Sequence, residues 1–179
     1  MNTPNKLTLL RMIMVPFFIA ALYLDFNIAA LIIFIAASFT DYLDGHLARK
    51  NNLVTNFGKL MDPLADKILT LSALVCFLEM KVPYLYAWMV VIIISREFLV
   101  TGIRMIALGD GKVIAASMWG KAKTVSQLAA IIAIMADRIL PLSFGGFHLT
   151  QVLIIAAVVL TVYSGFDYVK KNLSLLDFK

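Results

Sequence analysis

Apolar and polar residues follow one another along the chain in long blocks. The apolar blocks are Met12–Leu24, Ile28–Phe39, Ile68–Leu78, Val82–Ser95, Val125–Ala136 and Leu149–Gly165. Taken singly, a run of about ten to fourteen apolar residues is as typical of a buried core helix as of a membrane span. Most of these runs, however, continue into charged segments with few helix breakers. Spans of about 20 residues therefore fit if one end of each helix is polar and faces a cavity. The pattern predicts an all-α integral membrane protein with six transmembrane helices.

Composition supports the membrane interpretation. Hydrophobic residues fill 61% of the 179 positions and the mean hydropathy is +0.90, against roughly 45–50% apolar residues in an ordinary soluble domain. A soluble fold of this length could not cover so much apolar surface. The first block also resembles the core of a signal peptide, but no convincing cleavage site follows it, so we expect it to remain a span.

The distribution of lysine and arginine predicts the orientation. With the N-terminus inside, the outer turns fall near Asp25–Asn27, Glu79–Pro83 and Asp137–His148. Of the 16 basic residues, only Lys81 and Arg138 then lie outside. Cytoplasmic segments carry the excess of positive charge, so both termini are expected in the cytoplasm. The chain has no linker or composition break, which favours a single domain over residues 1–179. Its longer polar connections are on the inner side, where we expect the functional site.

Four aspartates recur at helical spacing near the second and third blocks. Asp41, Asp44, Gly45 and Ala48 stand at i, i+3, i+4 and i+7, and Gly58, Asp62 and Asp66 follow at every fourth position. Each set lies on one stripe of a helix. The eight residues between Arg49 and Gly58 would let the two helices pack antiparallel with their stripes facing each other.

Four converging carboxylates would have to be protonated, paired or bound to cations. Ligands that are all oxygen suit Mg²⁺ or Mn²⁺, and two such ions about 4 Å apart could clamp a phosphoryl group. Gly45 and Ala48 leave room for a ligand against the backbone, and Arg49 offers a fork for phosphate oxygens. The alternative is an ion-pair network between packed helices, which explains two aspartates more easily than four.

The pattern D-x2-D-G-x2-A-R-x8-G-x3-D-x3-D, complete from Asp41 to Asp66, resembles the signature of the CDP-alcohol phosphotransferases. The resemblance implies a membrane enzyme of six helices, usually a homodimer. Such an enzyme moves a substituted phosphoryl group from a CDP-linked donor to an alcohol and releases CMP. It also implies roles for individual residues. Asp41, Asp44, Asp62 and Asp66 would hold two divalent ions, Asp66 would also act as general base, and Gly45, Ala48, Arg49 and Gly58 would line the site of the CDP donor.

A second cluster of charged residues lies at the inner ends of the fourth and fifth blocks. Its basic members are Arg96, Arg104, Lys121 and Lys123. Part of this charge is the ordinary bias of inner segments, but four cations on adjacent helix ends also suggest a pocket for a small dianionic phosphate. Glu97 is expected to pair with one of them.

Two further strings resemble the phosphatidylglycerophosphate synthase branch of the same family. They are Pro4-Asn5-x-Leu7-Thr8-x-x-Arg11 and the series Ser95-Arg96-Glu97, Arg104, Gly120-Lys121-Ala-Lys123-Thr124-x-x-Gln127. They imply CDP-diacylglycerol as donor and sn-glycerol 3-phosphate as acceptor.

Other acceptors and one other class of protein stay open. Inositol phosphate would also suit the basic cluster, whereas serine would not need four cations. A divalent-cation transporter would want acidic groups along a path through the bilayer, and the outer half of each span has none. No serine, cysteine or histidine is poised as a nucleophile, which favours direct displacement. We expect a multi-pass protein of a bacterial plasma membrane, with its site facing the cytoplasm and no nucleic-acid partner.

Overall fold

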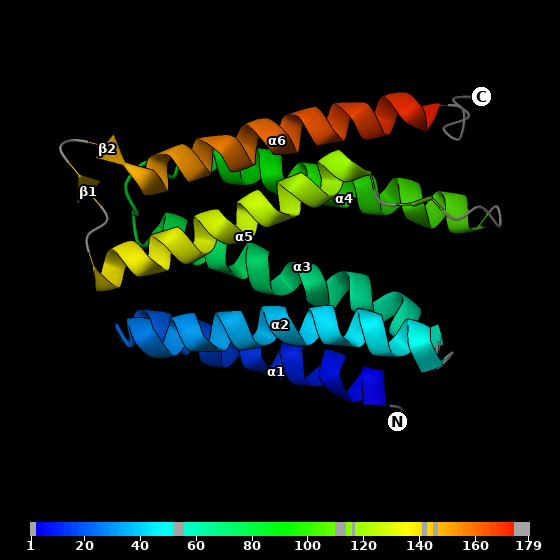
Figure 1. The fold of residues 1–179 in the computed structure, drawn as a ribbon, viewed down its shortest axis with the longest axis horizontal. Helices are drawn as coiled ribbons and strands as arrows, with labels where there is room; N and C mark the ends of the chain where they lie inside the picture. Colours follow the sequence, from blue (N-terminus) through cyan, green and yellow to red (C-terminus); the bar gives the residue numbers. More distant parts are fainter. Residues whose placement is uncertain are drawn as a thin grey trace. The chain divides into compact units, whose positions relative to one another are not determined.

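In the described part of the chain, the computed structural model has six helices and one short hairpin. The helices are α1 (Thr3–Tyr23), α2 (Asn27–Asn51), α3 (Asn56–Glu79), α4 (Ala87–Gly109), α5 (Met118–Ile139) and α6 (Leu149–Lys171) (Figure 1). Strands β1 (Ser143–Phe144) and β2 (Phe147–His148) pair antiparallel before α6. The structure describes residues 3–51, 56–109, 114–115, 117–140, 143–144 and 147–173. Side chains at 3–7, 41–51, 56–64, 66, 108, 143–144 and 147 lie outside the description.

The helices extend well beyond the apolar blocks at their polar ends, as predicted. α1 begins at Thr3, ahead of the block that opens at Met12, and α2 continues past Phe39 to Asn51. Each helix has 21 to 25 residues, enough to cross a hydrocarbon core of about 30 Å at 1.5 Å per residue.

Hydropathy alone recognises fewer spans than the block pattern predicts. Among the described residues, α6 is the one helix both long and apolar enough to pass as a membrane span by length and composition. The apolar parts of α1 and α2 within the described side chains are Thr8–Tyr23 and Asn27–Thr40, and the side chains just before Thr8 and just after Thr40 are not described. Six spans with cytoplasmic termini therefore stay a prediction.

The link between α2 and α3 differs from the sequence expectation. We expected eight residues between the two helical stripes, yet α2 runs to Asn51 and α3 starts at Asn56. Four of the eight residues expected in the connection therefore belong to the two helices. Pro63 also lies well inside α3, although a position in the first turn was expected. Membrane helices tolerate an interior proline because neighbouring groups can satisfy the freed carbonyl.

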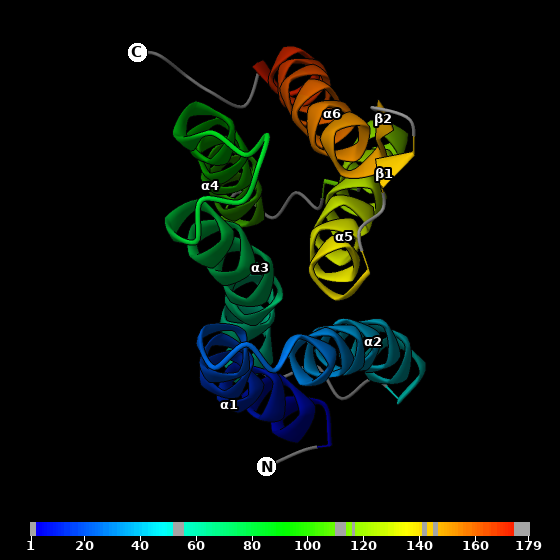
Figure 2. The same cartoon turned by 90° about the vertical axis from the view of Figure 1, so that its left-hand side faces the viewer.

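By its internal contacts the chain divides into two units, Met1–Glu79 with Met135–Pro141, and Met80–Ile134 with Leu142–Lys179. In the first unit, α1 packs against both α2 and α3, and α1 and α2 run side by side in opposite directions (Figures 1 and 2). The ring centroids of Phe18 and Phe34 are 5.6 Å apart. Ala30 and Ala37 on α2 are fully buried. Such small residues let helix backbones approach closely where lipid supplies no hydrophobic drive between helices.

The turn between α1 and α2 is a Schellman motif, and an arginine of α5 binds to it. The Phe26 amide donates to the Ala21 carbonyl at 2.9 Å, and Asp25 takes the left-handed conformation with φ 57°. Arg138 donates from Nη2 to the Asp25 carboxylate at 2.7 Å and from Nε to the Asn27 side chain at 2.8 Å. The predicted outer turn Asp25–Asn27 is thus confirmed as a turn, and Arg138 ties the end of α5 to it.

Replacing Arg138 with glutamine should destabilise the first unit by about 1–2 kcal/mol, because the Asn27 bond is lost together with an ion pair to a largely exposed carboxylate that contributes little. Thermal unfolding in detergent, followed by circular dichroism, measures the change. Lys170→Gln removes the same charge from an exposed position on α6 and serves as control. Equal melting temperatures for the two variants would contradict the role given to Arg138.

In the second unit, α6 packs against α4. Val100 and Ile103 of α4 form a buried cluster with Tyr168 of α6, while the rings of Trp119 and Tyr163 meet edge to face at 4.6 Å between α5 and α6.

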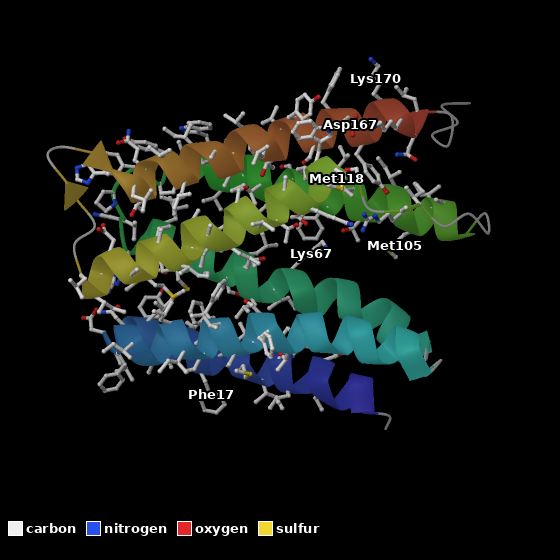
Figure 3. The ribbon with its side chains drawn as sticks, viewed as in Figure 1. Phe17, Lys67, Met105, Met118, Asp167 and Lys170 are labelled. Atoms are coloured by element: carbon white, nitrogen blue, oxygen red, sulfur yellow. The ribbon has the colours of Figure 1, made fainter. Side chains whose placement is uncertain are left out.

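Large apolar side chains remain on the outside of both units. Phe17 is 64% exposed and projects away from α1 (Figure 3), and Phe98 and Phe166 are similarly exposed. A surface so apolar is expected to face lipid.

Candidate functional site

The aspartate motif falls entirely on two helices that pack together. Asp41 and Asp44 lie in the later turns of α2, and Asp62 and Asp66 lie in the first three turns of α3. The helical backbone predicted from the spacing is confirmed at all four positions, and α2 contacts α3 within the first unit. The same holds for Gly45, Ala48 and Arg49 on α2 and for Gly58 on α3.

The side chains of these eight residues lie outside the described ones, so the convergence of the carboxylates stays a prediction. Ala65, between the last two aspartates of the motif, is buried with 1% of its surface exposed. The α3 backbone is therefore closely packed at the level of the motif. Among the side chains that the structure does describe, no group of three histidines, cysteines or acidic residues forms another candidate metal site.

In the second unit, a buried carboxylate joins two of the four predicted basic residues. Glu97 on α4 accepts hydrogen bonds at Oε1 from Lys123 on α5 and, at 3.3 Å, from Nη1 of the neighbouring Arg96. Lys123 is 3% exposed and Glu97 is 8% exposed. We refer to Arg96, Glu97 and Lys123 as the ion triad. It carries a net charge of about +1 in a setting where an unpaired ion would be costly.

Two glycines make room for the arginine of the ion triad. A Cβ atom on Gly165 of α6 would lie 3.1 Å from Cγ of Arg96, and one on Gly120 of α5 would lie 3.6 Å from Nη2 of Arg96. Any larger residue at 165 would therefore push on the arginine stem. Among the residues that the structure describes, nothing accepts a hydrogen bond from the buried Nε of Arg96 or from the buried Nε2 of Gln127. Both groups could therefore donate to a ligand.

A serine fixes the start of α5, which carries Lys123. Ser117 precedes the helix, and its Oγ accepts from the Gly120 amide at 3.0 Å. This is the bond of an N-cap, and it satisfies one of the free amides at the beginning of a helix.

Of the other two predicted basic residues, Arg104 lies at a distance from the ion triad, and Lys121 directly follows Gly120 at the start of α5. Arg104 lies eight residues beyond Arg96 on α4, about 12 Å along the helix axis. Its Nε donates to the Tyr168 hydroxyl at 3.2 Å, and Tyr168 is itself 2% exposed. Lys121 is exposed in the first turn of α5. The structure thus brings together Arg96 and Lys123, and it gives Arg104 a separate support.

Sequence reasoning missed the contribution of α6. Gly165 lies against the side chain of Arg96, and Tyr168 accepts a hydrogen bond from Arg104, whereas the site residues predicted from the sequence include none from α6. A glycine and a tyrosine that fall three residues apart near the polar end of an apolar helix are the signal that could have found them.

Comparisons with known proteins agree with the motif. A sequence model of the family described as CDP-alcohol phosphatidyltransferase matches residues 1–163. The chain is 42% identical to the CDP-diacylglycerol–glycerol-3-phosphate 3-phosphatidyltransferase of Bacillus subtilis, over 96% of this chain and 95% of that protein. It is 36% identical to the protein of the same name from Haemophilus influenzae, over 98% and 96%. A probable phosphatidylglycerophosphate synthase of Mycobacterium tuberculosis is 41% identical over 96% of this chain and 82% of its own length. The chain therefore belongs to the CDP-alcohol phosphatidyltransferase family.

Proposed function

We propose that this protein transfers the phosphatidyl group from CDP-diacylglycerol to sn-glycerol 3-phosphate, giving phosphatidylglycerophosphate and CMP. The observation that carries the proposal is the similarity, over nearly the full length of both chains, to relatives named for this reaction. The complete aspartate motif on two packed helices supports the reaction class, and the cations of the second unit support a phosphorylated acceptor.

The protein is proposed to work as a multi-pass enzyme of a bacterial plasma membrane, with both termini and the site on the cytoplasmic side, and as a homodimer. The exposed apolar side chains of α1, α4 and α6 support the membrane setting. The donor is a lipid and would enter from the bilayer. The acceptor is water-soluble and would arrive from the cytoplasm.

The aspartates suit a divalent-cation centre in the chemistry of their donor atoms. The four carboxylates offer only oxygen ligands, which favours hard ions such as Mg²⁺ or Mn²⁺, and members of this family in general depend on divalent metals. Asp41, Asp44, Asp62 and Asp66 would hold two such ions. Bound there, the ions would neutralise the diphosphate and stabilise the charge on the leaving CMP.

The chain's own residues would perform the rest of the reaction. Gly45, Ala48 and Gly58 would leave space for the CDP moiety against the helices, and Arg49 would bind a phosphate oxygen of the donor. Asp66 would take the proton from the C1 hydroxyl of glycerol 3-phosphate. The resulting oxygen attacks the phosphorus next to diacylglycerol, the bond from that phosphorus to the bridging oxygen breaks, and CMP leaves with the bonding electrons.

The acceptor phosphate is proposed to bind at Arg96, Arg104, Lys121 and Lys123, and these residues would have different roles. Lys123 and Glu97 are buried together, so Lys123 would act mainly by fixing the ion triad. Arg96 has a buried Nε donor that no described residue uses, and Tyr168 orients Arg104. These two arginines are the better candidates for direct contact with the phosphate.

The reaction is tested by CMP release from the purified, detergent-solubilised protein. CDP-diacylglycerol and Mg²⁺ are supplied with glycerol 3-phosphate, inositol 1-phosphate or serine in parallel. We expect release with glycerol 3-phosphate and its loss on chelation with EDTA, because four carboxylates without cations cannot hold the diphosphate. Release with another acceptor alone would keep the reaction and change the substrate. Absence of release with every acceptor would overturn the proposed function and favour transport of divalent cations.

A further inference from the structure

Arg11 is a fully charged residue buried in an apolar helix. It lies in α1, and both Arg11 and Thr8, one turn earlier, are 2% exposed. A guanidinium stays protonated in proteins. Its burial at a membrane position without negative charge nearby would cost several kcal/mol. The helices around α1 must therefore supply an anionic group at the level of Arg11.

The contact between α1 and α2 gives the register of these two helices. Phe18 of α1 meets Phe34 of α2, and the helices are antiparallel. Seven residues make about two turns and about 10 Å of helix. Arg11, seven residues before Phe18, therefore lies on the same side of α1 and faces α2. The backbone position of Asp41, seven residues after Phe34, lies at the same level on the side of α2 that faces α1.

A second contact gives the register of α1 against α3. The Tyr23 hydroxyl donates to the Glu79 carboxylate, and both helices run from the inner to the outer end. Twelve residues back along each helix from this contact come Arg11 on α1 and Lys67 on α3. Lys67 is half-buried and directly follows Asp66 in the sequence. Both registers place Arg11 at the level of the aspartate motif.

The other acidic residues of the first unit with described side chains lie at the opposite end. Glu79 lies at the level of Tyr23, which is twelve residues after Arg11 and about 18 Å from it along the helix axis. Asp25 lies in the outer turn, where it binds Arg138, and Asp137 stands next to Arg138 at the end of α5. The aspartates of the motif are the acidic residues at the level of Arg11.

We propose that Arg11 is a positioning residue for the cation site. Its planar fork would pair with the carboxylate of Asp41 and hold it in the ligating orientation. The charge of Arg11, with that of Lys67, would also offset repulsion among the four carboxylates before cations bind. The inference rests on the proposed function, since it takes these aspartates as cation ligands. Groups that orient metal ligands typically change metal affinity by about 10–100-fold when they are removed.

The test is Mn²⁺ binding to the detergent-solubilised full-length protein without substrates, with free Mn²⁺ measured by electron paramagnetic resonance. We expect Arg11→Gln to weaken Mn²⁺ binding by about 10–100-fold. Arg11→Lys keeps the charge without the planar fork, and its Mn²⁺ affinity should lie between those of the wild type and Arg11→Gln. Arg138→Gln makes the same substitution at the other end of the unit and should leave Mn²⁺ affinity unchanged. Circular dichroism reports whether each variant is folded.

The outcomes separate this inference from the proposed function. Unchanged or tighter binding in folded Arg11→Gln would overturn the role of Arg11 alone, because a cation that merely lay nearby would repel Mn²⁺ and its removal would tighten binding. If Arg11→Gln does not fold, a wild-type affinity in Arg11→Lys overturns the pairing and a weakened one supports it. A wild-type protein that binds no Mn²⁺ would overturn both proposals.

Discussion

Replacement of Asp66 by asparagine is expected to abolish CMP release, with kcat lowered by about 10²–10⁴-fold, the usual contribution of a general base. An amide of the same shape cannot take a proton from the acceptor hydroxyl at neutral pH. It keeps one oxygen that can still face a cation. Much of the Mn²⁺ binding and the KM for CDP-diacylglycerol should therefore survive, so that the loss falls on the chemical step.

Two measurements on the same preparation test this prediction. CMP release at saturating substrates gives kcat, and Mn²⁺ titration without substrates gives the affinity. Asp25→Asn is a matched control because Asp25 lies in the turn between α1 and α2 of the same unit, in the left-handed conformation with φ 57°, which asparagine adopts readily. Retained activity in Asp66→Asn would assign the base to another residue. Loss of activity together with all Mn²⁺ binding would make Asp66 a ligand only.

The helices and the location of the aspartate motif could be predicted from the sequence because both depend on local spacing. Residues at i, i+3 and i+4 share a helix face wherever that helix packs. The predicted helical stripes at Asp41 and Asp66 needed no tertiary information, and the backbone is helical at both. The link between α2 and α3 was mispredicted, because the eight residues between Arg49 and Gly58 were taken as the connection, whereas both helices run into that interval. At the inner end of a membrane helix, polar residues continue the helix into water.

The arrangement of the basic residues could not be predicted, because it depends on contacts between distant helices. The prediction that Glu97 pairs with one of the cations is confirmed, but the sequence did not indicate that its partners would be Arg96 and Lys123, the latter 26 positions away and 3% exposed. Gly165 and Tyr168 act on arginines of α4 only because α6 packs against that helix. The number of cations in a segment indicates its charge, but the packing of the helices determines which of these cations can bind a phosphate.

Replacing Glu97 with glutamine should be the most destabilising single change in the second unit, at about 3–5 kcal/mol, because it removes the counter-charge of a buried ion pair. Lys123 then loses the carboxylate that accepts from it, while the like charge of Arg96 stays nearby. An exposed pair offers a contrast. Asp167 binds Lys171 at 2.8 Å across one turn of α6, and the Lys171 side chain is 62% exposed. Asp167→Asn should cost less than about 1 kcal/mol.

Thermal unfolding in detergent compares the two single variants, and a double variant identifies the cause. Glu97→Gln with Lys123→Met removes both charges of the pair and keeps the volume of the lysine stem. If the lost attraction between Glu97 and the buried lysine is the source of the destabilisation, the double variant should recover most of the stability. A Glu97→Gln protein as stable as Asp167→Asn would contradict the ion triad as a structural element.

Kinetics of the double variant then separate stability from substrate binding. With Lys123 and Glu97 both neutral, Arg96 keeps its place between Gly120 and Gly165 but loses the carboxylate that orients its Nη1. A folded double variant should therefore show a raised KM for glycerol 3-phosphate, by about tenfold or 1.4 kcal/mol, with kcat close to that of the wild type. A wild-type KM would mean that the ion triad stabilises the fold alone. The acceptor phosphate would then have to be bound by Arg104 and Lys121 without the ion triad.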